Sequence, residues 1–264
     1  MLVKAARRLV RGVLQRTDHG SAFLMRRTCG VTGPHGRPDA PWCCAVLRSV
    51  DEVQKSVDQV RRLGLPPVGN LPKNWDSLAA LDVILRSTNS KALIFDAGGE
   101  KYSMILPWLA LYGYRHLIVG NQVFGQSFRK GPIVYEHADI VETRFPDGAL
   151  DAVTCLSVIE HGVDIDAYFR EMSRILRVGG LLITSTDYFE TPVDTGGRVA
   201  FGAPIRVFTK DDIGHALEVS AHYGFELVSP LDLHATEKVV YWKDYDLRYT
   251  FAIFSLRKGR LTKS

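Results

Sequence analysis

Hydrophobic positions along the chain follow two different periods, and the alternation between them predicts the fold. In several segments apolar residues recur every three or four positions, the spacing of a helix with one buried face. Between these segments lie short apolar runs that are too short for helices and suit buried strands. The predicted helices span 50–63, 74–85, 102–112, 165–178 and 210–223, and the predicted strands span 92–95, 116–119, 133–137, 151–156, 181–184, 225–233 and 249–256.

The segment 151–184 illustrates the predicted connection. A buried strand is followed by a helix with Asp164 as its N-cap, and Gly179-Gly180 is expected to end that helix before the next strand. This order makes a right-handed strand–helix–strand unit of a parallel sheet, so the fold class is α/β. Pro107 is expected to kink the helix that contains it.

The N-terminal part of the chain has a different pattern. Residues 2–16 form an amphipathic, basic helical pattern, and 17–48 are rich in Gly and Pro, as in a loop or linker. Three interpretations of 2–16 are open: a helix on an anionic membrane surface, a helix packed on the protein itself, and an organellar transit peptide. We therefore divide the chain into a 1–48 extension and a 49–264 domain, with lead-in helices at 50–88 and a core at 91–256.

Composition narrows the class of protein. The chain has 264 residues, 46% of them hydrophobic, which suits one globular α/β domain. Its net charge of +4 is concentrated in residues 1–50, so the main domain is not a basic nucleic-acid platform. The four cysteines show no CxxC spacing and indicate neither a disulfide framework nor a zinc site. We expect a cytoplasmic protein. If residues 2–16 form a helix on an anionic membrane surface, they would bring the protein to that membrane.

Candidate chemistry follows the ends of the predicted strands, where open α/β sheets bind ligands. Asp96, Ala97 and Gly98 come directly after the first core strand, and the glycines there let a ligand approach the backbone. The GxGxxG fingerprint of dinucleotide-binding proteins is absent, which disfavours a nicotinamide dehydrogenase. Further along, Ser157 begins a loop that contains the consecutive residues Glu160 and His161.

The segment 145–185 resembles a known family. It reads Phe-Pro-Asp-Gly, Asp-Ala-Val, Glu-His and then Arg-x-Leu-Arg-x-Gly-Gly, like the fourth and fifth strand region of class I S-adenosylmethionine-dependent methyltransferases, in particular type 11-like domains. The resemblance covers roughly 91–256. It implies a Rossmann-like, seven-stranded, mostly parallel sheet with helices on both faces and an antiparallel last strand. S-adenosylmethionine is the cofactor that it implies.

The resemblance also implies cofactor-binding positions. They are Asp96, Ala97, Gly98, Asn121, Asp139, Ile140, Leu156 and Ser157. The sequence departs from the family pattern twice, because the second glycine of the first motif is Glu100 and the acid that binds the ribose is Asn121. An amide lacks the charge of a carboxylate, so we expect weaker or differently arranged ribose binding.

Three residues are candidates for catalysis. His161 suits a general base near neutral pH, Glu160 would orient either its other nitrogen or the cofactor, and Asp187 is a second candidate base. A structural histidine that closes the loop is the alternative for His161. The spacing of these residues does not require a metal ion, so none is predicted. The long segment 187–208 is expected to form a lid that binds the acceptor.

The sequence thus favours a methyltransferase that modifies a small molecule or a glycan, and analogy points to polysaccharide biosynthesis. A methyltransferase-like fold without catalysis, serving as a binding or scaffold protein, is the alternative. Glu100 and Asn121 favour that alternative, whereas Asp96, Asp139 and the Glu160–His161 pair favour catalysis. A nucleic-acid substrate is not expected. The acceptor atom and the oligomeric state stay open.

Overall fold

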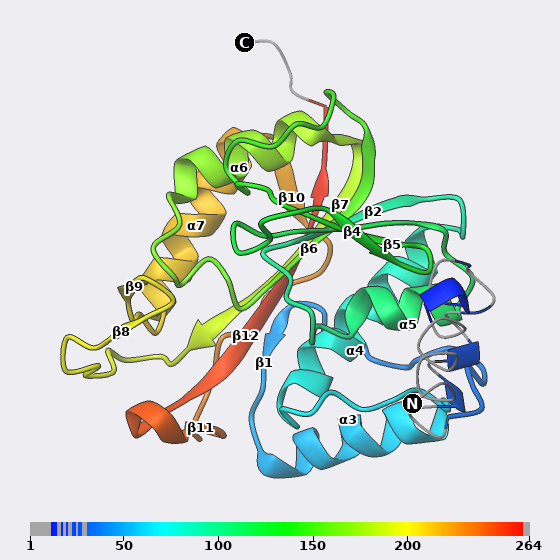
Figure 1. The fold of residues 1–264 in the computed structure, drawn as a ribbon. Coiled ribbons are helices and arrows are strands. Elements are labelled where there is room, and N and C mark those ends of the chain that lie inside the picture. Colours follow the sequence, from blue (N-terminus) through cyan, green and yellow to red (C-terminus); the bar gives the residue numbers. More distant parts are fainter. Residues whose placement is uncertain are drawn as a thin grey trace.

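The computed structural model describes residues 12–14, 17, 20, 23–24, 26–27 and 31–260. The basic pattern predicted at 2–16 lies mostly outside the described residues. The described part of the chain is a central twisted sheet with helices on its two faces (Figure 1). None of its helices combines the length and the apolar character needed to cross a bilayer.

The sheet contains the predicted parallel core. Strands β5, β3, β2, β6 and β7 lie side by side in parallel, and β12 pairs antiparallel with β7. Three short strands, β10, β1 and β11, pair in turn with the outer edge of β12, and β4 closes the other edge. The strands are β1 (Ala45–Val46), β2 (Leu93–Ala97), β3 (His116–Gly120), β4 (Phe128–Lys130), β5 (Ile133–Glu136), β6 (Leu150–Leu156), β7 (Leu176–Tyr188), β10 (Phe225–Leu227), β11 (Val240–Trp242) and β12 (Leu247–Lys258).

The predicted fold class is confirmed, but the sheet is larger than expected. The sequence does not predict β1, β4 and β11, which are only two or three residues long and carry little periodic signal. Residues 31–48 are mostly irregular, yet they supply β1 and the buried side chains of Ala40 and Leu47. A two-stranded hairpin, β8 (Val199–Ala200) and β9 (Ala203–Pro204), stands apart from the main sheet.

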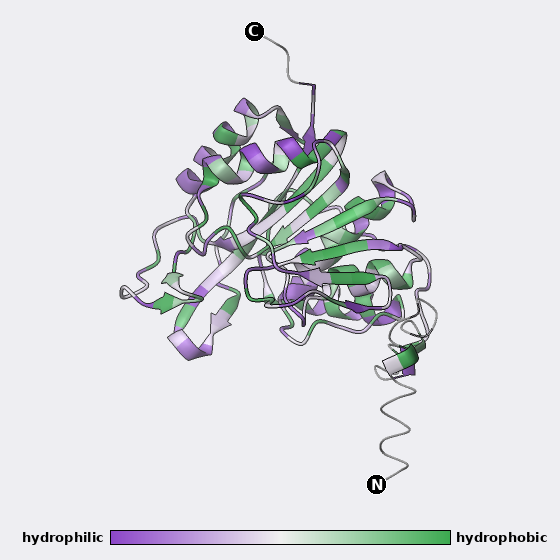
Figure 2. Cartoon of the chain, turned by 45° about the horizontal axis from the view of Figure 1, so that its top comes forward, coloured by the Kyte–Doolittle hydropathy of each residue, from purple (hydrophilic) through white to green (hydrophobic). Residues whose placement is uncertain are grey.

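The helices bury apolar stripes against both faces. Helices α4 (Lys73–Ser87) and α5 (Ile105–Leu111) cover one face with α3 (Val50–Arg62) packed on α4, and α6 (Ile165–Ile175) and α7 (Lys210–His222) cover the other. The strands are mostly hydrophobic, whereas the helices at the top of Figure 2 are banded in hydrophobic and hydrophilic residues. The amphipathic periods of the sequence thus correspond to one buried face per helix.

Side-chain caps fix where the helices begin. Asp164 accepts a hydrogen bond from Ala167 N and begins α6, as predicted. Thr209 and Asp212 form a full capping box at the start of α7. The sequence therefore determines these two boundaries locally.

Two predictions of local structure are wrong. Pro107 does not kink its helix, because α5 begins only at Ile105 and Pro107 occupies the first turn, where its missing N–H is not needed. Gly179-Gly180 does not end α6, because the chain is already extended at Leu176 and both glycines lie within β7. Leu176 there pairs with Leu150 of β6, so strand pairing ends the helix early.

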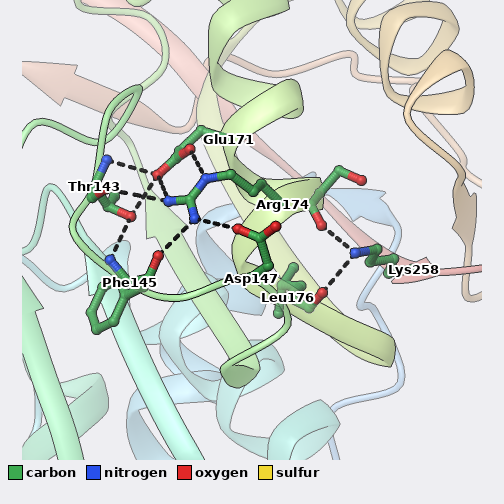
Figure 3. Close-up of polar contacts among 8 residues, drawn as sticks. Thr143, Phe145, Asp147, Glu171, Arg174, Leu176 and Lys258 are labelled. Carbon is green, nitrogen blue, oxygen red and sulfur yellow. Dashed lines mark hydrogen bonds and ion pairs between the residues drawn. The ribbon is translucent and has the colours of Figure 1, made fainter.

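A polar network fastens the Phe-Pro-Asp-Gly turn to α6 (Figure 3). Arg174 donates to both carboxylate oxygens of Glu171, to Asp147 Oδ1 and to the carbonyls of Thr143 and Phe145. Glu171 Oε1 in turn accepts from the backbone N–H and the hydroxyl of Thr143. This turn leads into β6, so the network holds the start of the strand whose far end carries the candidate site.

Replacement of Arg174 by Met is expected to lower the free energy of unfolding by about 2–3 kcal/mol, because it leaves the buried Glu171 carboxylate without its cation. Chemical denaturation measures this loss. Arg170→Met is the matched control, since Arg170 pairs with Asp166 on an exposed face of the same helix and should change little. Equal effects of the two replacements would contradict the assigned role.

Candidate active site

The carboxyl ends of β2, β6 and β7 lie next to one another and bring predicted site residues together. Asp96 in β2 stands opposite Thr154 in β6, and Leu156 in β6 stands opposite Ser185 in β7. Asp139 and Ile140 follow β5, two strands away from β2, at the outer side of this edge. The candidate residues are therefore spread along one edge of the sheet, with most of the acids near its middle.

Asp96 is a buried carboxyl with one free oxygen. Its Oδ1 accepts from the Thr154 hydroxyl at 2.6 Å, whereas Oδ2 is buried without a partner among the described residues. Burial raises the pKa of Asp96 to about 7, although Thr154 and the charge of Lys73 oppose the shift. The free oxygen can still accept a hydrogen bond from a cationic donor.

The glycine turn after β2 lies directly against this carboxyl. A Cβ added at Gly99 would lie 2.1 Å from Asp96 Oδ2, and Gly98 has a φ of +75° with the side chain of Val158 beside it. Ala97 is buried at the end of the strand. Only glycines fit this turn, which keeps the backbone close to Asp96. Glu100 does not start a helix here: its N–H donates to the Ser103 hydroxyl, and α5 begins only at Ile105.

Asn121 supports the glycine turn from the end of β3. Its Nδ2 donates to the carbonyls of Gly98 at 2.9 Å and Gly99 at 3.2 Å, and its Oδ1 accepts from Val123 N. Both ends of the Asn121 amide therefore form hydrogen bonds to backbone groups of the surrounding loops. An amide suits this position because it can donate and accept at once. On the outer side, Asp139 Oδ1 accepts from Val141 N, and the Ile140 side chain is buried.

Asn121→Asp, which restores the acid typical of the family, is expected to lower rather than raise affinity for S-adenosylmethionine. A carboxylate would face two carbonyl oxygens and lose both hydrogen bonds, which costs about 1–3 kcal/mol of stability. Thermal unfolding and cofactor titration measure the two effects. Asn89→Asp is the control, because exposed Asn89 uses only its oxygen, as an acceptor. Tighter cofactor binding by Asn121→Asp would contradict this role.

Lys73, which the sequence did not single out, connects α4 to the loop after β6. Its Nζ donates to Asp76 Oδ2 at 2.7 Å and to Ser157 Oγ at 2.6 Å, and lies 4.4 Å from the centre of the Phe251 ring. Asp76, fully buried, also accepts from the Ser185 hydroxyl at 2.7 Å. The sequence did contain one indication of this contact. Asp76 lies in a largely apolar helical segment, and a buried acid there needs a partner.

Glu160 and Asp187 form a buried carboxyl pair. Glu160 accepts from the Thr186 hydroxyl and from Asp187 N, both at 3.1 Å. Burial and the charge of Glu160 raise the pKa of Asp187 well above its ordinary value, against the opposing effects of Lys73 and a hydrogen bond from the Tyr249 hydroxyl. Asp187 therefore retains a proton to higher pH than a free carboxyl. No three side chains of the metal-ligating types gather to hold an ion within the described part of the chain.

His161 lies at the surface of this cluster. Its backbone N–H donates to Val158 O, and its ring packs against Phe201 with 4.9 Å between the ring centres. The Nδ1 atom is buried and has no partner among the described residues, so Glu160 does not orient this nitrogen. His161 is thus the candidate that has a ring nitrogen without a hydrogen-bond partner in the described part of the chain.

Comparison with known proteins agrees with this fold. Residues 118–184 match the model of the family described as Methyltransferase domain. A sterol 24-C-methyltransferase of Gibberella zeae is 26% identical over 144 residues, which cover 48% of this chain and 38% of that protein. One from Aspergillus fumigatus is 26% identical over 126 residues, covering 44% and 30%. The chain spans well under half the length of these relatives.

Two solved structures share the fold at low sequence identity. The 1,6-didemethyltoxoflavin N1-methyltransferase of Burkholderia thailandensis, solved with S-adenosylhomocysteine, has a TM-score of 0.52 and 17% identity over 87% of this chain and 100% of that one. The geranyl diphosphate C-methyltransferase of Streptomyces coelicolor has a TM-score of 0.51 and 14% identity over 90% and 98%.

The family match covers about a quarter of the chain, and the two solved structures cover most of it. Residues 118–184 are thus similar to the methyltransferase domain family, and the described chain shares its fold with methyltransferases of known structure. The cofactor predicted from the sequence is S-adenosylmethionine, and the Burkholderia thailandensis methyltransferase was solved with the related S-adenosylhomocysteine.

Proposed function

We propose that the protein transfers a methyl group from S-adenosylmethionine to a small-molecule acceptor. The observation that supports this proposal most strongly is the excess of buried acidic side chains over cations at the carboxyl ends of the strands. Four buried acids, Asp76, Asp96, Glu160 and Asp187, lie in one region in which Lys73 is the cation that lowers the pKa of Asp96 and Asp187. Such a region favours a ligand that brings further positive charge.

The residues present fit the cofactor. Its ammonium group would meet the free Asp96 Oδ2 beside Gly98 and Gly99, with Ala97, Leu156 and Ser157 along the same edge. Asp139 and Ile140 would lie toward the adenine, farther along the strand ends. When bound, the cofactor supplies an activated methyl group on a positively charged sulfur. The chain's own contribution is to hold the two reactants in line and to exclude water.

His161 is the base that this geometry favours. Its Nδ1 has no partner among the described residues, so the imidazole is not committed to a hydrogen bond there and would take the proton that an acceptor hydroxyl or amine loses during methylation. Asp187, the other candidate, is enclosed by Glu160 and Tyr249 and holds its proton more tightly than a free acid. We therefore assign Glu160 and Asp187 to the support of the loop and of local charge.

The proposed class of acceptor is based on similarity to other proteins. The similar proteins are named for a sterol, for geranyl diphosphate and for didemethyltoxoflavin, all small molecules. This supports a small-molecule acceptor for the lid formed by 187–208. The glycan acceptor and the role in polysaccharide biosynthesis rest on analogy from the sequence alone.

Calorimetric titration with S-adenosylmethionine, followed by transfer of its labelled methyl group to a panel of phenols, amines, sterols and glycosides, tests the proposal. Binding in the range of about 1 µM to 1 mM and label on an acceptor are the expected results. Binding without transfer to any acceptor would favour the scaffold alternative. Absence of cofactor binding at millimolar concentration would contradict the proposal outright.

A further inference from the structure

The hairpin β8–β9 presents an aromatic residue at a position that is unfavourable for stability. Its two turn residues, Phe201 and Gly202, have φ values of +52° and +83°, a conformation for which Asn-Gly is the preferred pair. A bulky residue is strained at positive φ. The Phe201 side chain is also 72% exposed. Neither backbone preference nor burial explains a phenylalanine here, so a role for the exposed ring is indicated.

Phe201 is the centre of a row of rings that leads outward from His161. Its ring contacts His161 on one side and stacks on Trp242 on the other, with 6.2 Å between the ring centres and 23° between the planes. Trp242 then meets Tyr245 edge-on at 4.4 Å. The aromatic row, defined as His161, Phe201, Trp242 and Tyr245, thus joins the loop after β6, the hairpin, and the end of β11 with the turn that follows it.

The hairpin is fixed in this place from both sides. Arg198 donates to the carbonyl of Tyr245, which ties the hairpin to the segment after β11. On the other side, a Cβ added at Gly162 would lie 3.2 Å from the Ala203 methyl group, so the hairpin lies against the loop that carries His161. The aromatic row is therefore held in place beside the loop that carries His161 and is not a set of scattered exposed rings.

We infer that the aromatic row is the acceptor subsite and that it takes a planar aromatic molecule with a hydroxyl or ring N–H. This inference rests on the proposed function, because it assigns the acceptor of the same site. The exposed ring of Phe201 favours stacking with a planar ring, beside Trp242. The hydroxyl or N–H of such a molecule would then lie toward the end of the row that His161 forms.

The test compares two probes with one carbon skeleton. Titration of the full chain with 2-naphthol and with decahydro-2-naphthol separates ring stacking from apolar burial alone. The wild-type protein is expected to bind the planar probe about tenfold more tightly, and Phe201→Asn is expected to lose that preference. Because Asn suits the turn better, the same variant is expected to unfold at an equal or higher temperature.

Two outcomes would overturn the inference: equal binding of the two probes by the wild-type protein, or an unchanged preference in Phe201→Asn. Tighter binding of methyl β-glucoside than of 2-naphthol would also overturn it. S-adenosylmethionine is titrated into the same samples. Absence of cofactor binding with an intact ring preference would contradict the proposed function alone, whereas normal cofactor binding without the preference would contradict the aromatic subsite alone.

Discussion

Asp96→Asn is expected to weaken binding of S-adenosylmethionine by about 10- to 100-fold, because a hydrogen bond between a carboxylate and a cation contributes about 1.5–3 kcal/mol. The bond to Thr154 survives, since the Asn oxygen can still accept it. The loss should therefore come from the missing charge and not from a collapsed strand end. Calorimetry gives the dissociation constants of both proteins.

The same variant should change how stability depends on pH. In the folded protein the pKa of Asp96 is raised to about 7, above its value of 3.8 in the unfolded chain. The stability that the protonated carboxyl contributes is complete below pH 3.8 and is lost as pH rises toward 7. Asp96→Asn should remove this part of the slope, whereas the exposed Asp211→Asn control should keep it. Unchanged cofactor affinity together with an unchanged slope would contradict the role of Asp96.

Lys73→Met is expected to lower the free energy of unfolding by about 3–5 kcal/mol at neutral pH. The replacement leaves Asp76, which is fully buried, without its cation, and removes the charge that lowers the pKa of Asp96. Part of the loss should be recovered as pH falls and Asp96 protonates. Denaturant unfolding at several pH values measures both effects.

Two further variants separate charge from packing. Lys55→Met is the matched control, because Lys55 pairs with Asp51 on an exposed helix surface and should matter little. The double variant Lys73→Met/Asp76→Asn should be more stable than Lys73→Met alone, since it removes the unpaired buried charge. If the double variant were no more stable, or the control lost as much, Lys73 would not act as the cation of the cluster.

The sequence predicts the fold well where the signal is local and periodic. The caps at Asp164 and Thr209 and the apolar runs of the parallel core are fixed by neighbouring residues, so they could be recognised before the structure. Short edge strands such as β1 and β4 form because a partner strand offers free hydrogen-bonding groups, and no local pattern records that. The end of α6 was mispredicted for the same reason. Leu176 pairs with β6 and ends the helix before the chain reaches Gly179-Gly180.

For the candidate site, the sequence indicated which residues follow the strands but not how they pair. Glu160 and His161 are neighbours in the chain, yet Glu160 turns inward to Asp187 and His161 outward to Phe201. Lys73 lies 84 residues from Ser157, its hydrogen-bond partner, and could not be linked to it by spacing. Long-range packing of α4 onto the strand ends decides this contact.

Proton release on cofactor binding is the most direct test of the central claim, that the cation of S-adenosylmethionine meets Asp96. At pH 6 a carboxyl with a pKa of about 7 is mostly protonated, and a bound ammonium group would drive that proton off. Calorimetric titration in two buffers of different ionisation enthalpy should show release of about 0.9 protons by the wild-type protein and almost none by Asp96→Asn. Binding without proton release, or equal release by both proteins, would contradict the claim.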